Sequence, residues 1–346
     1  MKRILSILLI FIFAVSLLFG CGKKTGEAAN TGTDASSATE TETEIETEPA
    51  PPETLDDPYP DEGFDPPLWK VTSSDGKTLY LFGTMHAGTD KNDSILARVD
   101  KVLSRCDSLA VEFDVVAYQQ DLAGMMNDIQ AFVLRDGTTV KDHSGEELYE
   151  KMASALKDCG LYSPLYDTYS LSMWSQLIEQ VYLMKSSVST DFAIDSMLIE
   201  RAYALGLPVL DVESASFQYN LLASFSDEIN KLLIRSTLDM TYEEYDELLT
   251  RMYEAWLKGD TEAILDVEDE EYGEEPTEEE QKLLDYYELK MITERNEGMA
   301  KKAIEYIESG DTVFFAVGTA HMLDEKGVVN LLTEAGYTVE RISVND

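Results

Sequence analysis

LWKVTSSDGKTLYLFGTMH, residues 68–86, contains two β-rich runs around a polar segment and ends on one of only three histidines in the chain. The Asp75-Gly76 step in the polar segment is typical of a tight turn, so the stretch predicts a β-hairpin. The second run closes with GTMH, in which glycine lets the backbone turn at the end of the strand. His86 therefore stands directly behind a hydrophobic strand, where a functional side chain would be presented.

The same arrangement recurs near the other end of the chain. TVFFAVGTAH, residues 312–321, has an unbroken apolar run that predicts a fully buried strand, and it ends on His321. A single such histidine is most simply a partly buried residue satisfied by a backbone carbonyl. Two matched Gly-Thr-x-His motifs, each behind an apolar strand, favour a functional role instead. The supporting residues of the two motifs are Gly83, Thr84, Gly318 and Thr319.

Two further strands carry acidic residues. SLAVEFDV (108–115) includes Glu112, and GLPVLDVES (206–214) includes Glu213. Strands separated by helices predict an α/β fold with a small mixed, mostly parallel sheet, large helical insertions and pseudo-duplicated halves. In such sheets ligands bind beyond the carboxyl ends of the strands. We therefore expect the two histidines and the two glutamates to meet at one edge.

Two imidazoles and two carboxylates suit a divalent metal such as Zn, Mn or Co. Metal-bound water becomes a nucleophile at neutral pH, and one carboxylate can serve as general base. The predicted ligands are His86, Glu112, Glu213 and His321, with Glu112 and Glu213 also the candidate catalytic bases. The third histidine, His143, lies in a polar segment and is expected at the surface.

The first twenty residues read as a secretory signal, with a basic start and a long apolar run. Cys21 follows Gly20 directly, as at the cleavage site of a bacterial lipoprotein, so lipidation of Cys21 is predicted to hold the protein at a membrane. An uncleaved transmembrane anchor is the alternative. Both interpretations place the remainder of the chain outside the cytoplasm.

Residues 21–66 are dominated by Thr, Glu, Ala, Ser and Pro, and we expect the lipid-bearing cysteine to be followed by a disordered acidic tether. The folded domain is then predicted to span residues 67–346. Within it, Ser144 before Gly145-Glu146-Glu147 predicts a capping box for the helix EELYEKMASALKDCG. Cys106 and Cys159 could form one disulfide or remain two buried thiols.

The formal net charge is −40. A chain this acidic lacks the basic surface that nucleic acids require, so DNA and RNA are excluded as partners. Direct docking on an anionic membrane surface is disfavoured for the same reason. Divalent cations, in contrast, are attracted by such a field.

Taken together, residues 67–346 resemble the TraB/GumN family, also called the TraB/PrgY/GumN group, which includes the animal Tiki proteins. The resemblance rests on the order and spacing of several segments: LWKVTSSDGKTLYLFGTMH, SLAVEFD, DSMLIERAYALGLPVLDVES, TERNEGMA and FFAVGTAHMLDEKGVVNLLTEAGYTVERI. The family is similar to a broader group of metal-dependent hydrolases with paired GxxH motifs. Tiki proteins are manganese- or cobalt-dependent proteases that cleave a secreted signal, and bacterial TraB-like members are linked to shutting down peptide pheromones.

The resemblance implies roles for two more residues. Arg295, within TERNEGMA, matches a recurrent arginine that could orient a carboxylate or stabilise an oxyanion. Pairing with acids on a helix surface is its structural alternative. Asp195 matches a recurrent acid that could support a metal ligand, while a helix N-cap or surface position is the alternative.

The sequence thus predicts a lipid-anchored, extracytoplasmic metal-dependent hydrolase acting on a peptide or secreted signal. The alternative is a non-catalytic lipoprotein that binds and sequesters a peptide pheromone or signal. A third interpretation is a cell-envelope assembly factor that uses the fold as a scaffold.

Overall fold

The computed structural model describes residues 54–268 and 276–346. The predicted signal peptide, Cys21 and the tether up to residue 53 lie outside the described residues. Within the described ranges, no helix is both long enough and apolar enough to cross a bilayer.

The predicted hairpin is confirmed. Strand β1 (Leu68–Thr72) pairs antiparallel with β2 (Thr78–Thr84), in a register that joins Leu68 to Phe82. Gly76 in the turn has a φ of 88°, which a residue with a side chain rarely adopts. The hairpin therefore fixes the direction in which β2 delivers the first Gly-Thr-x-His motif.

The sheet has six strands in the order β4-β3-β5-β2-β1-β6. The four remaining strands are β3 (Ser108–Val111), β4 (Val209–Asp211), β5 (Val313–Gly318) and β6 (Thr338–Arg341). Strands β4, β3, β5 and β2 are mutually parallel, whereas β1 runs antiparallel to both of its neighbours. The predicted α/β fold with a mostly parallel sheet is confirmed.

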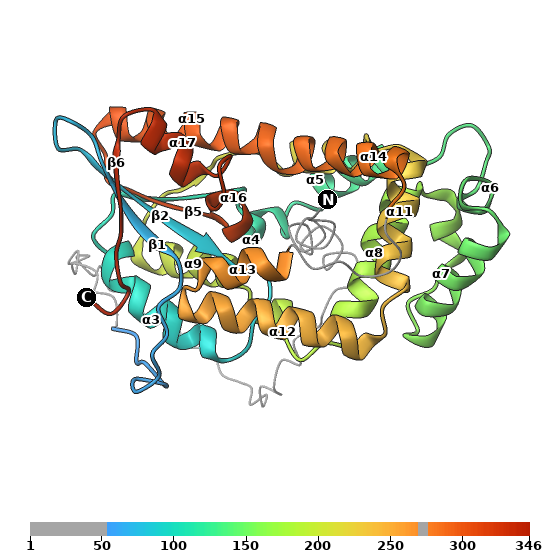
Figure 1. Cartoon of the computed structure of the whole chain (residues 1–346), viewed down its shortest axis with the longest axis horizontal. Helices are drawn as coiled ribbons and strands as arrows, with labels where there is room; N and C mark the ends of the chain where they lie inside the picture. Colours follow the sequence, from blue (N-terminus) through green and yellow to red (C-terminus); the bar gives the residue numbers. More distant parts are fainter. Residues whose placement is uncertain (1–53, 269–275) are drawn as a thin grey trace, which may run out of the picture.

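Helices lie on either side of the sheet (Figure 1). Helices α15 (Glu294–Ser309) and α17 (Val328–Glu334) are on one side, and α3 (Lys91–Leu103) is on the other. Helix α9 (Ile194–Leu205) packs on α3 and on strands β3 and β4, and the short α16 (Thr319–Met322) follows β5 directly.

Apart from α9 and α15, most helices between β3 and β4, and between β4 and β5, build a second region of the molecule beside the sheet (Figure 1). Apart from α9, the first insertion contains α4 (Val115–Tyr118), α5 (Leu122–Ile129), η1 (Gln130–Phe132), α6 (Val140–Ser144), α7 (Glu146–Asp158), η2 (Pro164–Thr168), α8 (Leu171–Leu183) and η3 (Thr190–Phe192). The second contains α10 (Ala215–Ala223), α11 (Asp227–Leu238), α12 (Tyr242–Lys258), α13 (Thr261–Glu268), α14 (Glu278–Glu288) and the π-helical η4 (Leu289–Thr293), which leads into α15.

Contacts with the folded domain begin before residue 67, the predicted start of that domain. The carboxylate of Asp57 accepts a hydrogen bond from Arg98 of α3 at 2.9 Å, and the Phe64 side chain is buried in the core. Arg98 also donates to the Phe64 carbonyl. The segment from Asp57 onward therefore belongs to the folded domain, because Phe64 lies in the core and Tyr59 packs against it.

The predicted cap at Ser144 is wrong. Ser144 ends α6, and α7 begins at Glu146 with Gly145 as its N-cap residue. Gly145 has a φ of 81°, and no side chain caps α7. The conformation of Gly145 joins the two helices directly. The Ser144 hydroxyl donates to the Gly145 carbonyl and does not cap α7.

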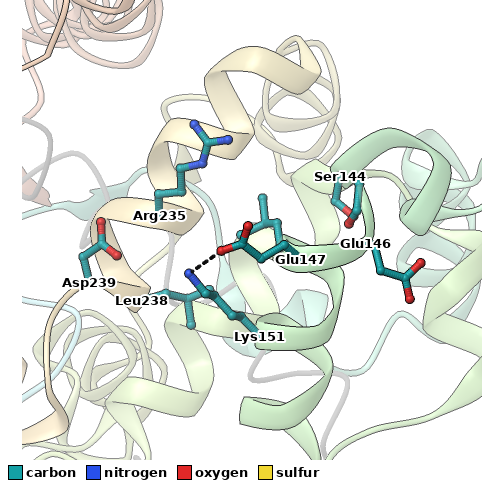
Figure 2. Close-up of a pocket in the computed structure, with 9 residues that line it drawn as sticks. Ser144, Glu146, Glu147, Lys151, Arg235, Leu238 and Asp239 are labelled. Carbon is teal, nitrogen blue, oxygen red and sulfur yellow. Dashed lines mark hydrogen bonds and ion pairs between the residues drawn. The ribbon is translucent and has the colours of Figure 1, made fainter.

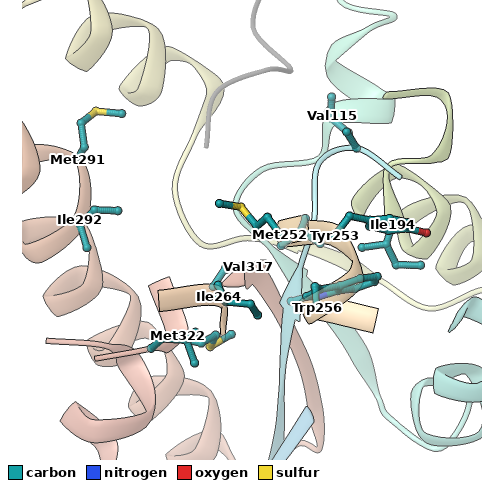
Figure 3. Packing of buried hydrophobic residues seen from close by; sticks show 14 of the residues in the cluster. Val115, Ile194, Met252, Tyr253, Trp256, Ile264, Met291, Ile292, Val317 and Met322 are labelled. Carbon is teal, nitrogen blue, oxygen red and sulfur yellow. The ribbon is translucent and has the colours of Figure 1, made fainter. Parts of the chain in front are cut away.

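The apolar core extends from the sheet into the helical region. Figure 3 shows Trp256 of α12, Val317 of β5 and Met322 of α16 in this packing. Trp256 is fully buried, stacks on Tyr253 with ring centroids 5.9 Å apart, and donates its indole N–H to the Gly83 carbonyl at 2.8 Å. Helix α12 thereby fixes the end of β2. Cys106 and Cys159 are free thiols.

Candidate functional site

Four parallel strands end at the same edge of the sheet, and each delivers one of the predicted site residues. From β4 to β2 the order is Glu213, Glu112, the GTAH motif and the GTMH motif. The pairing of β3 with β4 continues past the strands, because Glu213 N donates to the Glu112 carbonyl at 2.9 Å. Glu112 directly follows β3, the second strand of the four, and is flanked on both sides.

The two Gly-Thr-x-His motifs interlock. Thr84 pairs with Gly318 in the β2–β5 ladder, and Thr319 Oγ1 donates to the Thr84 carbonyl at 2.9 Å. A Cβ atom added to Gly83 would lie 2.8 Å from Thr319 Oγ1, closer than real Cβ contacts allow. The first glycine is therefore required because the second motif packs directly against it.

Gly318 serves a different purpose. A Cβ atom added there would meet Glu112 Oε1 at 3.3 Å, His86 Nε2 at 3.4 Å and His321 Cδ2 at 3.6 Å. Its missing side chain keeps open the space between these three groups, where a ligand atom could be held.

Glu112 connects the two histidines. Its Oε1 lies 4.0 Å from the Nε2 atoms of both His86 and His321, so these nitrogens are at most twice that distance apart. The same oxygen accepts the Gly318 N–H at 3.0 Å. The chain thus brings both motif histidines to one carboxylate oxygen.

Arg295 holds the two glutamates together. Its Nη2 donates to Glu112 Oε2 at 2.7 Å and to Glu213 Oε2 at 2.8 Å, while its Nε donates to Glu213 Oε1 at 2.9 Å. Gln218 of α10 donates its amide to both carboxylates at 2.9 Å. Arg295 is 2% exposed, so the surface-arginine alternative does not apply. Its contacts match the carboxylate-orienting role.

Local structure explains how Arg295 reaches this position. The π-helical turn η4 immediately precedes α15, and Arg295 Nη1 donates to the Met291 carbonyl within that turn. π-Helical turns inside helices are frequent at functional sites because they redirect the side chains that follow.

The buried ion network controls protonation. Burial alone would raise the pKa of Glu112, but the charge of Arg295 and the neighbouring histidines outweigh it and lower that pKa to about 2. Burial opposes the charge of Arg295, yet Glu213 and Glu112 raise its pKa. Glu112 is therefore a carboxylate, and Arg295 a cation, at neutral pH.

His86 is paired with a carboxylate. Its Nδ1 lies 2.9 Å from Asp195 Oδ2, and Thr84 Oγ1 donates to Asp195 Oδ1 at 2.6 Å. Asp195 is 9% exposed and belongs to the first turn of α9, so it is neither a surface residue nor an N-cap. Burial would lower the pKa of His86, but the charge of Asp195 and its hydrogen bond raise it overall.

His321 is paired with a neutral amide instead. Its Nδ1 lies 2.6 Å from Asn296 Oδ1, and Asn296 Nδ2 donates to the Lys326 carbonyl at 2.9 Å. Burial, and to a smaller extent the charge of Arg295, lower the pKa of His321 to about 3. His321 is therefore neutral at physiological pH.

The residue types fit a divalent cation, although they do not form a closed metal cluster. His86, Glu112 and His321 offer two imidazole nitrogens and one carboxylate oxygen, and the fully buried His321 Nε2 has no hydrogen-bond partner among the described residues. Two donors in a tetrahedral zinc site stand roughly 3.4 Å apart, less than the 4.0 Å found here. Across residues 54–268 and 276–346, no group of three or more His, Cys, Asp or Glu side chains is arranged to hold a metal ion.

The structure brings together every site residue predicted from the domain sequence. Glu213 differs from Glu112, because Arg295 and Gln218 occupy both oxygens of Glu213, whereas they donate to Oε2 of Glu112 and leave Oε1 to the Gly318 N–H and the histidines. Sequence reasoning missed Gln218 and Asn296. Asn296 adjoins Arg295 within TERNEGMA, and that adjacency was the available signal.

Two open pockets lie outside this centre. One, of about 690 Å³, is formed by α7 and α11 and is lined by Glu147, Lys151 and Arg235 among others, with none of the predicted site residues (Figure 2). The other, of about 290 Å³, adjoins the ends of β3 and β4. Two aspartates of its lining, Asp114 and Asp121, are N-caps of α4 and α5, which accounts for part of its acidity.

The chain belongs to the TraB/PrgY/gumN family, because the model of that family matches residues 67–341. This match confirms the resemblance drawn from the motifs and covers the whole sheet and the four strand ends of the site. Neither a curated protein nor a solved structure matches the chain.

Proposed function

We propose that this member of the TraB/PrgY/gumN family is a membrane-tethered, extracytoplasmic hydrolase that cleaves a peptide or secreted signal with the help of a divalent metal ion. The observation that carries the proposal is the approach of His86 Nε2 and His321 Nε2 to the same oxygen of Glu112, 4.0 Å from each. Two buried imidazoles and a charged carboxylate are donors that a divalent ion takes, which favours metal-assisted hydrolysis over sequestration of a peptide.

The three donors His86, Glu112 and His321 would hold the ion. Glu213 would not, since Arg295 and Gln218 occupy both of its oxygens. When bound, the ion supplies Lewis-acid polarisation of a carbonyl oxygen. Mn, Co and Zn all suit imidazole and carboxylate donors, so the donor set leaves the metal open among these three.

Side chains around the centre would orient its ligands and set their charge. Asp195 pairs with His86 Nδ1 and orients the ring, which directs Nε2 toward Glu112 Oε1, where the ion would be held. Arg295 keeps Glu112 ionised and fixes one of its oxygens, which leaves Oε1 directed toward the two histidines. Burial of the centre strengthens each of these interactions.

Two parts of the proposal rest on the sequence alone. The peptide substrate comes from the family resemblance, and the membrane tether comes from the signal segment ending at Cys21. Replacement of Cys21 by alanine is expected to release the protein from the membrane fraction and abolish incorporation of labelled fatty acid. Unchanged fractionation and labelling would contradict lipidation at this residue.

The test of hydrolysis uses the metal-stripped full chain and a peptide library, with Mn²⁺, Co²⁺ or Zn²⁺ added back. We expect at least one ion to restore cleavage, and His86→Gln or His321→Gln to lower it by about 10²-fold or more. His143→Gln is the matched control, because His143 pairs with Asp227 and Thr138 away from the centre. Peptide binding without cleavage under every metal would overturn the hydrolase and favour the sequestering lipoprotein.

A further inference from the structure

We propose that Asn296 is a positioning residue that fixes His321 as the tautomer protonated at Nδ1, so that the lone pair of Nε2 is presented to the centre. The inference goes beyond the ligand set of the proposed function to the device that prepares one ligand. It concerns the same site and rests on the proposed function only for its consequence, metal binding.

The orientation of the Asn296 amide follows from its other partner. The Lys326 carbonyl can only accept, and it lies 2.9 Å from the amide nitrogen of Asn296. A flipped amide would place two acceptor oxygens against each other there and leave the NH₂ group toward His321. The hydrogen-bond network therefore directs the amide oxygen at the imidazole.

The tautomer of His321 follows from that orientation. The amide oxygen of Asn296 lies 2.6 Å from His321 Nδ1, a distance that requires a hydrogen between the two atoms. The hydrogen must reside on Nδ1, because an amide oxygen carries none. A neutral imidazole has a single N–H, so Nε2 is left with its lone pair.

Burial stabilises the Asn296–His321 hydrogen bond against replacement by water or by the other tautomer. Asn296 and His321 are both 0% exposed, so water cannot replace the amide oxygen as an acceptor. An Nε2–H tautomer would oppose two lone pairs across 2.6 Å and would leave a buried acceptor unsatisfied, which disfavours that tautomer. The amide also adds no charge to a centre that already contains Glu112 and Asp195. Asn296 thus fixes the orientation and tautomer of the His321 ring without adding a negative charge beside it.

The tautomer can be measured without substrate or metal. The chain has only three histidines, so ¹⁵N labelling of their rings gives three sets of signals, and His321→Gln identifies the set that belongs to His321. In the metal-free full chain we expect a protonated Nδ1 and a bare Nε2 for this ring. A wild-type spectrum with the proton on Nε2, or on both nitrogens, at neutral pH would overturn the inference.

Two variants test whether Asn296 is the cause. Asn296→Ala should shift the His321 ring toward a mixture of tautomers, and Asn296→Asp should keep Nδ1 protonated while moving its proton resonance to that of a charge-assisted hydrogen bond. Asn230→Ala is the matched control, since Asn230 is also buried and its amide donates to Ser172 and backbone carbonyls instead. Unchanged His321 signals in either Asn296 variant would contradict the assignment.

The consequence for metal binding is a separate readout. Loss of a partner that orients a ligating histidine weakens metal affinity by about 10–100-fold, so Asn296→Ala should weaken Co²⁺ binding by that factor and Asn230→Ala should not. If the tautomer is as proposed but wild-type protein binds no Co²⁺, the positioning role stands and the metal-dependent function fails. If wild-type protein binds Co²⁺ and Asn296→Ala binds it equally well, the positioning role fails.

Discussion

The two Gly-Thr-x-His motifs share three of their four residues, yet their histidines occupy opposite surroundings. His86 faces the carboxylate of Asp195, which raises its pKa, and His321 faces the amide of Asn296 and is neutral. The local sequence behind each strand is the same, and the partners come from different helices, α9 and α15. The motif positions the ring, and a residue far away in sequence sets its chemistry.

The glycines and threonines show the same division. Gly83 makes room for Thr319, whereas Gly318 makes room between Glu112 and the two rings. Thr84 supports Asp195, and Thr319 ties the second motif to the first. One copy of the motif therefore serves packing and a charged partner, while the other serves the open space of the centre.

The largest expected effect on stability is that of removing Arg295, which pairs with Glu112, the carboxylate that both motif histidines approach. Arg295→Met leaves Glu112 and Glu213 buried without their cation, which should cost about 3–5 kcal/mol in the free energy of unfolding. Lys290→Met is the control, because the Lys290–Glu294 pair is at the surface and should contribute at most about 1 kcal/mol. Chemical denaturation measures both, and equal losses would mean that the buried network does not hold the centre together.

The pH dependence of stability separates the two histidines. His321 has a lowered pKa in the folded state, so its contribution is present above the unfolded value near 6.5 and is lost as pH falls toward 3. His86 has a raised folded pKa, so its contribution is present below about 6.5 and is lost as pH rises through the folded value. Each contribution changes by at most about 1.4 kcal/mol per pH unit.

Comparison of two variants isolates these slopes. His321→Gln should flatten the acid side of the stability profile, and His86→Gln the side above pH 6.5, as followed by denaturation across pH. Profiles that change on the same side in both variants would show that the histidines are equivalent, contrary to the geometry.

The threonines are expected to differ by a smaller amount. Thr84→Val removes a hydrogen bond to the carboxylate of Asp195 and should cost about 1.5–3 kcal/mol, whereas Thr319→Val removes one to a backbone carbonyl and should cost about 0.5–1.5 kcal/mol. Urea denaturation of the two variants measures the difference. A larger loss for Thr319→Val would reverse the proposed roles.

The glycines complete the series. Gly83→Ala should destabilise the fold by about 1–3 kcal/mol, because the new methyl group collides with Thr319. Gly318→Ala should cost less in stability but obstruct ligand binding between Glu112 and the rings, lowering Co²⁺ affinity by about tenfold. Thermal unfolding and calorimetric titration separate the two, and a variant pair with identical behaviour in both assays would contradict the distinction.

The sequence predicted the fold and the four strand ends because these depend on local patterns. The Asp75-Gly76 turn, the apolar run before Gly318 and the acidic strand ends can each be recognised within about ten residues. The repeated Gly-Thr-x-His motif also indicated that the two ends of the domain sequence meet, as the pairing of β2 with β5 shows. The short tether segment with Phe64 was missed because an average composition conceals a single aromatic residue that docks on the core.

The residues that orient the histidines and the glutamates could not be predicted from local patterns. Asn296 and Gln218 lie on helices, where a lone amide has no local pattern that distinguishes it from a surface residue. Asp195 was expected through the family resemblance alone, because the first turn of a helix is a common place for any acid. Their roles depend on how α9, α10 and α15 pack on the strand ends, which is a tertiary property.

Titration of the metal-stripped full chain with Co²⁺, followed by visible absorption, tests most directly whether His86 and His321 form one centre. We predict one ion bound per wild-type chain, loss of that binding in both His86→Gln and His321→Gln, and unchanged binding in His143→Gln. Binding that survives in either of the first two variants with the same affinity and spectrum would contradict a shared centre.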